Sequence, residues 1–321
     1  TTTAKEDGFN SQSDIVQIAR QVPVIRRRFA PGSEWLYAKI YCGPAEVDRV
    51  LRDIVGPLAR RVLNEGLADR WFFVRYGDPD WHLRVRFHGR PQDLMGEICP
   101  MLYAELHDSL ANGAIRRLQL DTYEPELERY GGMEGLTLTE QLFHVDSEAV
   151  IEILESGIGG ETGSDARFRL ALCGMNRLLT DLGFDLPVRT NVFKWARRNF
   201  LREFQADDRL HAELSARYRQ ERKQISDLLS PVWREDHPLA GGLSALARRS
   251  ERMKPIAAEL RAAWENGRLA HSLPDLSFSY LHMHANHLLR IRQRAQEMVL
   301  YDWLARWHIS QQERESQLSK S

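Results

Sequence analysis

Apolar and polar residues alternate with two different periods in the first half of the chain, one typical of strands and the other of helices. In order, the pattern predicts strand, helix, strand, strand, helix and strand at residues 35–42, 44–66, 71–76, 82–88, 92–112 and 115–123. The turn-forming residues Gly77-Asp78-Pro79-Asp80 separate the second and third strands, which indicates a hairpin. This order is that of a ferredoxin-like split unit, whose two helices cover one face of an antiparallel sheet and leave the other face available.

Beyond Gly131 and Gly132 the strand period disappears and helices follow one another. They are expected at residues 138–156, 164–182, 188–203, 207–229, 242–266 and 276–308, separated by breaks that contain Gly or Pro. We therefore expect an α+β protein in which a ferredoxin-like split β-α-β unit packs against a larger helical portion. The expected division is an N-terminal extension at 1–30, the ferredoxin-like portion at 31–134, the helical portion at 135–310 and a disordered tail at 311–321.

Composition and charge exclude several classes of protein. A net charge of −1 over 321 residues provides no overall field that would attract nucleic acid or an anionic membrane, so no direct nucleic-acid contact is expected. No stretch approaches the roughly 20 apolar residues of a membrane-spanning helix, and no signal-peptide core opens the chain. Cys42, Cys99 and Cys173 lie in apolar runs without a CxxC pattern, which is typical of free thiols in a reducing compartment. A cytoplasmic protein without a membrane span is expected.

The hairpin carries the first candidate chemistry. Strand alternation in His82-Leu83-Arg84-Val85-Arg86 sends Arg84 and Arg86 to the same face, about 7 Å apart at roughly 3.3 Å per residue. Two neighbouring guanidinium groups form a receptor for a carboxylate, because each offers paired donors in a plane. The alternative is a charged strand face that simply contacts water.

Two further segments add an ion pair and a histidine. Glu126 and Arg129 lie three residues apart before the Gly131-Gly132 pair, so one helical turn would place them side by side; a surface ion pair is the alternative. His282 and Asn286 are four apart on a predicted helix and share a face. Histidine is suited to proton transfer near neutral pH, although a structural histidine is equally compatible with the pattern. Without an HExxH motif, no metal site is expected.

Taken together, the motifs resemble a known family. They are WLYxKIY, WFFxRYxDPDxHLRxRF, DTYxPExERYGG, FHxDSE and HMxxN, and they occur in the order found in the C-terminal small domain of class I lantibiotic dehydratases, the glutamate elimination domain. The same domain also occurs as a free-standing protein in thiopeptide pathways, and the free-standing form is the one expected here. The resemblance covers roughly residues 35 to 308, and the hairpin and RYGG motifs are its most specific parts.

The resemblance implies an enzyme, a lyase that acts on a ribosomally made precursor peptide. In the family, a partner domain esterifies Ser or Thr side chains of the peptide with glutamate taken from glutamyl-tRNA. The small domain then eliminates glutamate and leaves dehydroalanine or dehydrobutyrine. The implied partners are the precursor peptide, with its leader and glutamylated core, and a separate glutamyl-tRNA-dependent esterifying subunit; no cofactor is implied.

Carrying the family's functional residues over to matching positions implies a catalytic set of Arg84, Arg86, Glu126, Arg129 and His282. Elimination expels a carboxylate and places negative charge on the peptide carbonyl, and arginines stabilise both. Our hypothesis is that Arg86 and Arg129 hold the glutamyl group, with Arg84 supporting them. Glu126 orients Arg129 or pairs the glutamyl ammonium, and His282 is the acid or base. Pro125 departs from the family's usual residue, so the alignment there depends on the RYGG motif.

The sequence leaves two other functions open. Thiopeptide pyridine synthases, which join two dehydroalanines by a formal [4+2] cycloaddition with leader-peptide release, resemble the same fold family, but they have no glutamate to hold. A non-catalytic subunit that binds the precursor peptide is the second alternative, in which an extended leader pairs with an exposed edge of the sheet. The arginine motifs favour elimination over both alternatives.

Overall fold

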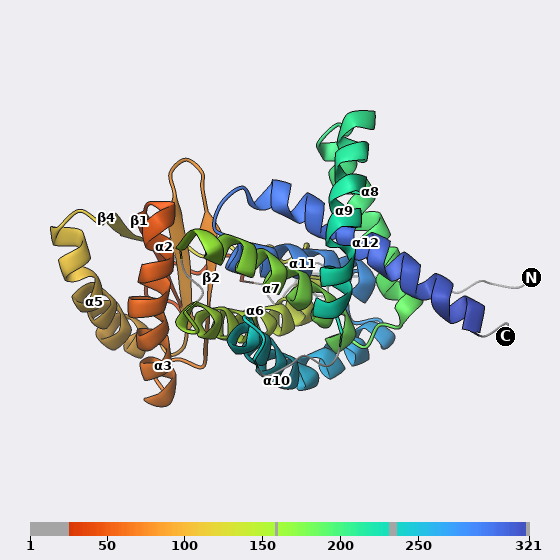
Figure 1. The fold of residues 1–321 in the computed structure, drawn as a ribbon. Coiled ribbons are helices and arrows are strands. Elements are labelled where there is room, and N and C mark those ends of the chain that lie inside the picture. Colours follow the sequence, from red (N-terminus) through yellow and green to blue (C-terminus); the bar gives the residue numbers. More distant parts are fainter. Residues whose placement is uncertain (1–25, 158–159, 231–235, 319–321) are drawn as a thin grey trace, which may run out of the picture.

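A four-stranded antiparallel sheet lies at one end of the molecule (Figure 1). The computed structural model describes residues 26–157, 160–230 and 236–318. The strands are β1 (Trp35–Cys42), β2 (Arg70–Tyr76), β3 (His82–His88) and β4 (Ile115–Leu120), and their order in the sheet is β2-β3-β1-β4. Each neighbouring pair is antiparallel. The α+β class is confirmed, and the strand order is that of the ferredoxin-like unit.

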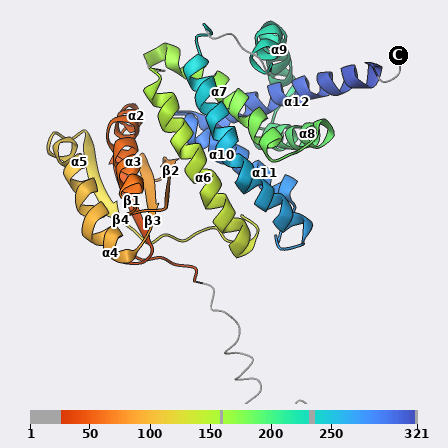
Figure 2. The ribbon, with the colours of Figure 1, turned by 90° about the horizontal axis from the view of Figure 1, so that it is seen from below.

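Two interrupted helices cover one face of this sheet (Figure 2). Their parts are α2 (Pro44–Val50), η1 (Leu51–Val55) and α3 (Gly56–Asn64), then α4 (Pro91–Asp93), η2 (Leu94–Ile98) and α5 (Cys99–Ala111). Each contains one wider π turn, directly before Gly56-Pro57 and Cys99-Pro100. Proline has no N–H to donate to the preceding turn, which accounts for the widening. Leu83, Val85 and Phe87 of β3 are fully buried, as expected for the covered face.

Seven helices form the remainder of the described chain. They are α6 (Gly132–Glu155), α7 (Gly160–Asp181), α8 (Leu186–Glu203), α9 (Asp208–Leu228), α10 (Ala240–Glu265), α11 (Leu273–Leu288) and α12 (Gln293–Leu318). Of these, α6 and α11 pack against β2, on the side of the sheet away from α5 (Figures 1 and 2). Over the described ranges, no helix combines the length and apolar character needed to cross a membrane.

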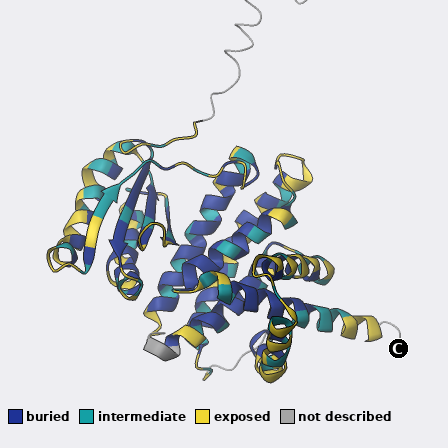
Figure 3. Ribbon diagram, turned by 90° about the horizontal axis from the view of Figure 1, so that it is seen from above, coloured by how far each residue is buried: buried dark blue, intermediate teal, exposed yellow. Residues whose placement is uncertain are grey.

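The late helices differ from expectation in two ways. The single helix expected at 276–308 is wrong, because the chain leaves the helical conformation at Leu289 and Arg292 has a positive φ of 49°. Apolar residues continue through this break, so periodicity alone could not show it. The expected tail is helical from Gln311 to Leu318, since its Gln, Glu and Arg residues favour helix even when exposed. Figure 3 shows α12 buried near the core and exposed toward its C-terminal end. The division into domains stays a prediction.

Side chains from α6 cover the outer edge of β2. His144 Nδ1 lies 3.4 Å from the amide nitrogen of Trp71 and 3.2 Å from its carbonyl oxygen. The Phe73 amide donates to Ser147 Oγ over 3.4 Å. An edge strand normally exposes such groups to water or to another strand. The FHxDSE motif therefore serves to satisfy the backbone of β2.

Helix α11 completes this edge. Asn286 Oδ1 accepts from the Arg75 amide over 2.9 Å, and its Nδ2 donates to the Arg75 carbonyl over 2.8 Å. The buried Arg75 guanidinium also pairs with Asp48 of α2 at 2.8 Å, and Asp48 pairs with Arg167 of α7 at 2.9 Å. Burial raises the pKa of the Asp48 carboxyl, but the two arginines outweigh it and the pKa is lowered overall. Ion pairs thus connect the sheet, its helices and the helical portion.

A buried charge network holds the central helices together. Asp146 of α6 accepts from Arg249 of α10 at 2.8 Å, and its two oxygens lie 2.8 and 2.7 Å from Nδ1 of His284 and His287 on α11. Arg249 also donates to the Gly174 carbonyl of α7 at 2.7 Å. Burial opposes ionisation of Asp146, yet the histidines and Arg249 lower its pKa well below the ordinary value. The network joins four helices at one carboxylate.

Neighbouring arginines on α10 allow a matched test of this network. Arg249→Met leaves the buried Asp146 without its full cationic partner, so we expect a loss of about 3–5 kcal/mol in the free energy of unfolding. Arg248→Met breaks a solvent-exposed pair with Glu152 and should cost less than about 1 kcal/mol. Urea denaturation of the two variants and the parent measures both values. Equal midpoints for the two variants would contradict the assigned role of the network.

Candidate functional site

Arg86 lies on the sheet face that the paired helices leave uncovered. Its guanidinium is 4.4 Å from the ring centre of Tyr37, 5.1 Å from that of Phe72 and 4.8 Å from that of Tyr123. Tyr37 and Phe72 are its register partners on β1 and β2. The residue is only 7% exposed, and burial lowers its pKa. Within the described chain, Nε and Nη1 find no hydrogen-bond acceptor. Arg86 is therefore a buried cation with two donors to offer.

Arg84 lies two residues earlier on the same face of β3. Its guanidinium stacks 3.4 Å from the ring centre of Tyr76, and Nε donates to His82 Nε2 over 3.2 Å. The charge of Arg84 contributes to lowering the pKa of Arg86, so the two cations influence one another. The face is thus cationic along the strand and lined by aromatic rings.

Glu126 and Arg129 form an ion pair in the turn between β4 and α6. Arg129 Nη1 donates to Glu126 Oε2 over 2.7 Å, and Nε donates to Ser279 Oγ of α11 over 3.2 Å. The neighbouring Tyr130 is buried, which raises its pKa to about 12 although Arg129 and Arg86 both act to lower it. Both guanidinium charges therefore act on a single phenol. Contacts connect the two arginines as well: the Arg129 guanidinium lies 5.6 Å from the Tyr130 ring centre, and ring contacts run from Tyr130 through Phe143 to Phe72, beside Arg86.

His282 lies on α11, one helical turn after Ser279. Its Nδ1 is 3.1 and 3.0 Å from the two oxygens of Glu297, whose side chain is fully buried. A carboxylate only accepts hydrogen bonds, so Nδ1 donates the hydrogen bond to Glu297. Nε2 is then available to accept a hydrogen bond or a proton. Gln293 Nε2 donates to Glu297 at 2.7 Å, which holds the carboxylate in place. The histidine thus has a fixed ring orientation.

These contacts show which expected residues come together. Arg129 joins Glu126 directly and reaches α11 through Ser279, next to the turn that carries His282. Arg86 is linked to this corner through ring contacts of Phe72, Phe143 and Tyr130. Across the described residues, no hydrogen bond joins Arg84 or Arg86 to Arg129 or His282.

Two acidic residues near these side chains are not among the residues that the sequence motifs indicated. One is Glu297, the partner of His282. The other is Glu140 of α6, which accepts from the Tyr123 hydroxyl over 2.9 Å and from Arg70 Nη2 over 3.4 Å. Burial raises the pKa of Glu140 to about 7, against the opposing effect of Arg70, Tyr123 and Arg86. Each is a lone acid at a buried position of a helix, which is the only signal that could have drawn attention to them. In the part of the chain that the structure describes, no group of three or more His, Cys, Asp or Glu residues could hold a metal ion.

The family model for the lantibiotic biosynthesis dehydratase C-terminus matches residues 35–308. The chain belongs to this family. Within it, the chain is 32% identical over 120 residues to the subtilin biosynthesis protein SpaB of Bacillus subtilis, a match that covers 37% of this chain and 12% of SpaB. It is 33% identical over 138 residues to the nisin biosynthesis protein NisB of Lactococcus lactis subsp. lactis, covering 42% of this chain and 13% of NisB. The matches thus span about an eighth of these relatives.

Solved structures of similar fold include both long and short chains. The lantibiotic dehydratase MibB of Microbispora sp. 107891 matches with a TM-score of 0.69 and 26% identity, over 89% of this chain and 29% of MibB. TsrL matches with a TM-score of 0.62 and 15% identity, over 85% of this chain and 93% of TsrL. The pyridine synthase TbtD of thiomuracin biosynthesis gives 0.60 and 18%, over 85% of this chain and 98% of TbtD. At these identities TsrL and TbtD show the fold alone.

The unpaired state of Arg86 has a consequence for stability. In Arg86→Met the lost cation–π attraction is offset by the removed cost of burying a cation, so we expect the free energy of unfolding to change by less than about 1 kcal/mol. Arg70→Met instead leaves Glu140 without its arginine and should cost about 1–3 kcal/mol. Urea denaturation at pH 8, where Glu140 with its pKa of about 7 is mostly ionised, compares the two. A larger loss for Arg86→Met would show that Arg86 is structural.

Proposed function

We propose that this protein eliminates glutamate from O-glutamylated Ser or Thr residues of a ribosomal precursor peptide. The observation that carries the proposal is the buried Arg86 guanidinium with two donors unpaired among the described residues. A buried cation without a partner is costly and is typically retained where it meets an anionic ligand. The glutamyl group supplies such an anion when its ester breaks.

Negative charge develops at two places during this reaction, and the named side chains are suited to stabilise it. A base removes the Cα proton of the esterified residue, a Cα–Cβ double bond forms, the Cβ–O bond breaks and glutamate leaves as a carboxylate. Negative charge therefore grows on the peptide carbonyl and on the departing oxygen. Arg86 and Arg129 hold the glutamyl group and its leaving carboxylate, and Arg84 adds positive charge beside Arg86. Glu126 orients Arg129 or pairs the glutamyl ammonium.

His282 is the group that we assign to proton transfer. With Nδ1 directed at Glu297, a neutral ring presents Nε2 as the acceptor for the Cα proton. The Glu297 carboxylate then stabilises the imidazolium that forms. Such an arrangement needs no metal and no organic cofactor.

The names of the similar proteins support the proposed function. SpaB and NisB are subtilin and nisin biosynthesis proteins, and MibB is a tRNA-dependent lantibiotic dehydratase. We accordingly assign a precursor peptide as the substrate. The separate glutamyl-tRNA-dependent esterifying subunit and the cytoplasmic location remain predictions.

The two alternatives are less well supported. A pyridine synthase joins two dehydroalanines and has no glutamate to bind, so the Glu126–Arg129 pair and the strand arginines would have no purpose in it. The likeness to TbtD concerns the fold alone. A non-catalytic subunit that adds a leader strand to the sheet could not do so at β2, because His144, Ser147 and Asn286 already occupy its edge.

Mass spectrometry tests the activity directly. Incubated with a glutamylated precursor peptide, the parent protein should release glutamate and leave dehydrated residues. Arg86→Ala and His282→Ala should slow this step by about a hundredfold or more, because each removes a charge-stabilising or proton-transfer group. Arg209→Ala, which breaks an exposed pair with Glu213, is the control and should match the parent. Consumption of a fully dehydrated peptide with macrocycle formation would instead identify a pyridine synthase.

Glu297→Gln tests the histidine pair. The amide keeps a hydrogen bond to Nδ1 but no longer stabilises an imidazolium, so we expect kcat to fall roughly tenfold to a hundredfold with little change in KM. Glu203→Gln is the matched control, since Glu203 also pairs with Arg294 but does not contact the imidazole. A rise in KM with kcat unchanged would place Glu297 in substrate binding instead.

A further inference from the structure

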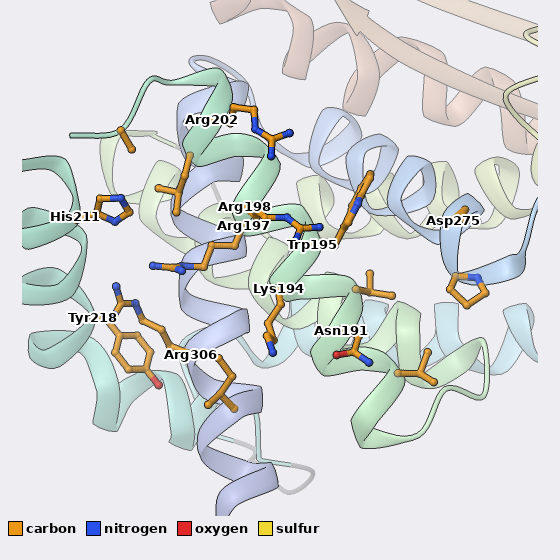
Figure 4. Close-up of a pocket in the computed structure, with 16 residues that line it drawn as sticks. Asn191, Lys194, Trp195, Arg197, Arg198, Arg202, His211, Tyr218, Asp275 and Arg306 are labelled. Carbon is orange, nitrogen blue, oxygen red and sulfur yellow. The ribbon is translucent and has the colours of Figure 1, made fainter. Parts of the chain in front are cut away.

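A concave site separate from the candidate site lies among α8, α9, α11 and α12, away from the sheet (Figure 4). It is a groove of about 1300 Å³. Its cationic lining consists of Lys194, Arg197, Arg198, Arg202 and Arg306, whereas Asp275 is the single carboxylate of its lining. A net charge of −1 for the whole chain makes this local excess of positive charge unusual.

The cations of the groove fall into two groups. Arg197 and Arg306 share the buried carboxylate of Asp302, at 2.6 and 2.8 Å, and are therefore neutralised in part. Lys194, Arg198 and Arg202 instead follow one another at intervals of four along α8, which places them in one exposed stripe. Their side chains have no ion pair with any residue that the structure describes. This stripe is the part of the groove that is free to bind an anion.

The wall beside the stripe is apolar. It includes Val188, Val192 and Ile309, and Trp195 is 43% exposed with its ring edge-on to Phe278 at 4.8 Å. Apolar surface next to spaced cations complements a peptide that carries both acidic and apolar side chains. A nucleic acid is disfavoured, because Glu203, Asp207 and Asp208 follow the stripe directly in the sequence.

The groove is connected to the candidate site by side-chain contacts. Glu203 follows Arg202 and accepts from Arg294 Nε over 3.1 Å. Arg294 Nη1 in turn lies 3.5 Å from His282 Nδ1 and 3.4 Å from Glu297. Helix α11 contributes Asp275 to the groove and, further along, His282 to the candidate site. Side-chain contacts and helix α11 therefore join the groove to the surroundings of His282.

We infer that this groove binds an acidic segment of the peptide substrate, with carboxylates on Lys194, Arg198 and Arg202 and an apolar side chain against Trp195. The inference rests on the proposed function for the identity of the peptide, but not for the binding itself. Fixing one segment of a long peptide would raise the effective concentration of its glutamylated residues at the candidate site.

Binding is tested without any reaction. A fluorescein-labelled peptide that alternates Glu and Leu should bind the parent, and its affinity should fall roughly tenfold or more in the triple variant Lys194→Glu, Arg198→Glu, Arg202→Glu. The control variant is Arg52→Glu, Arg61→Glu, Arg90→Glu. It changes the net charge by the same amount, but its three positions belong to the helices that cover the sheet and do not line the groove, so it should bind like the parent. Equal affinity in both triple variants overturns the inference. Displacement of the peptide by an RNA oligonucleotide at lower concentration also overturns it, as does binding of free glutamate with no binding of the peptide.

Turnover separates this inference from the proposed function. Two glutamylated peptides, one with an acidic segment and one with the same length of neutral residues, are compared by kcat/KM. The parent should prefer the acidic peptide by about tenfold, the groove variant should lose that preference and the control variant should keep it. Failure of the parent to act on either peptide contradicts the proposed function, while the binding result still decides the groove. Turnover by the parent without preference contradicts the groove alone.

Discussion

The outer edge of β2 is the interaction on which the rest of the structure depends. Its inner edge is bonded to β3, and side chains of α6 and α11 bond to its outer edge in place of another strand. Hydrogen bonds to backbone groups are directional, so they fix the position of α11 along the strand, which apolar contact alone would not do. The positions of Ser279 and His282 relative to the arginines of β3 are fixed as a result. The candidate site is a product of this alignment.

The site combines cations held in different ways. Arg129 is oriented by a carboxylate and a hydroxyl, whereas Arg86 is surrounded by three aromatic rings that attract its charge without using its N–H groups. Rings leave a guanidinium free to form hydrogen bonds, which a carboxylate partner would not. A buried charge without a hydrogen-bonded partner is unfavourable for stability, and such exceptions are commonly found at functional sites. The aromatic surroundings of Arg86 leave its N–H groups available for the anionic ligand that we propose.

Local patterns predicted the parts of the molecule that local geometry decides. Alternation along a strand placed Arg84 and Arg86 on one face, and a spacing of three placed Glu126 beside Arg129. Contacts between distant elements were beyond such patterns. Glu297 meets His282 only because the chain turns between α11 and α12, inside a stretch whose unbroken apolar period indicated one helix. The groove, likewise, exists only where four helices pack together.

The covering of β2 leaves β4 as the other edge of the sheet. Its exposed residues include Arg116 and Arg117, adjacent in the strand. A second copy approaching in antiparallel fashion would bring like charges together there, and such repulsion is a common protection against the joining of sheets between molecules. Side chains thus occupy one edge of the sheet and charge protects the other, and the face away from the paired helices carries the candidate site.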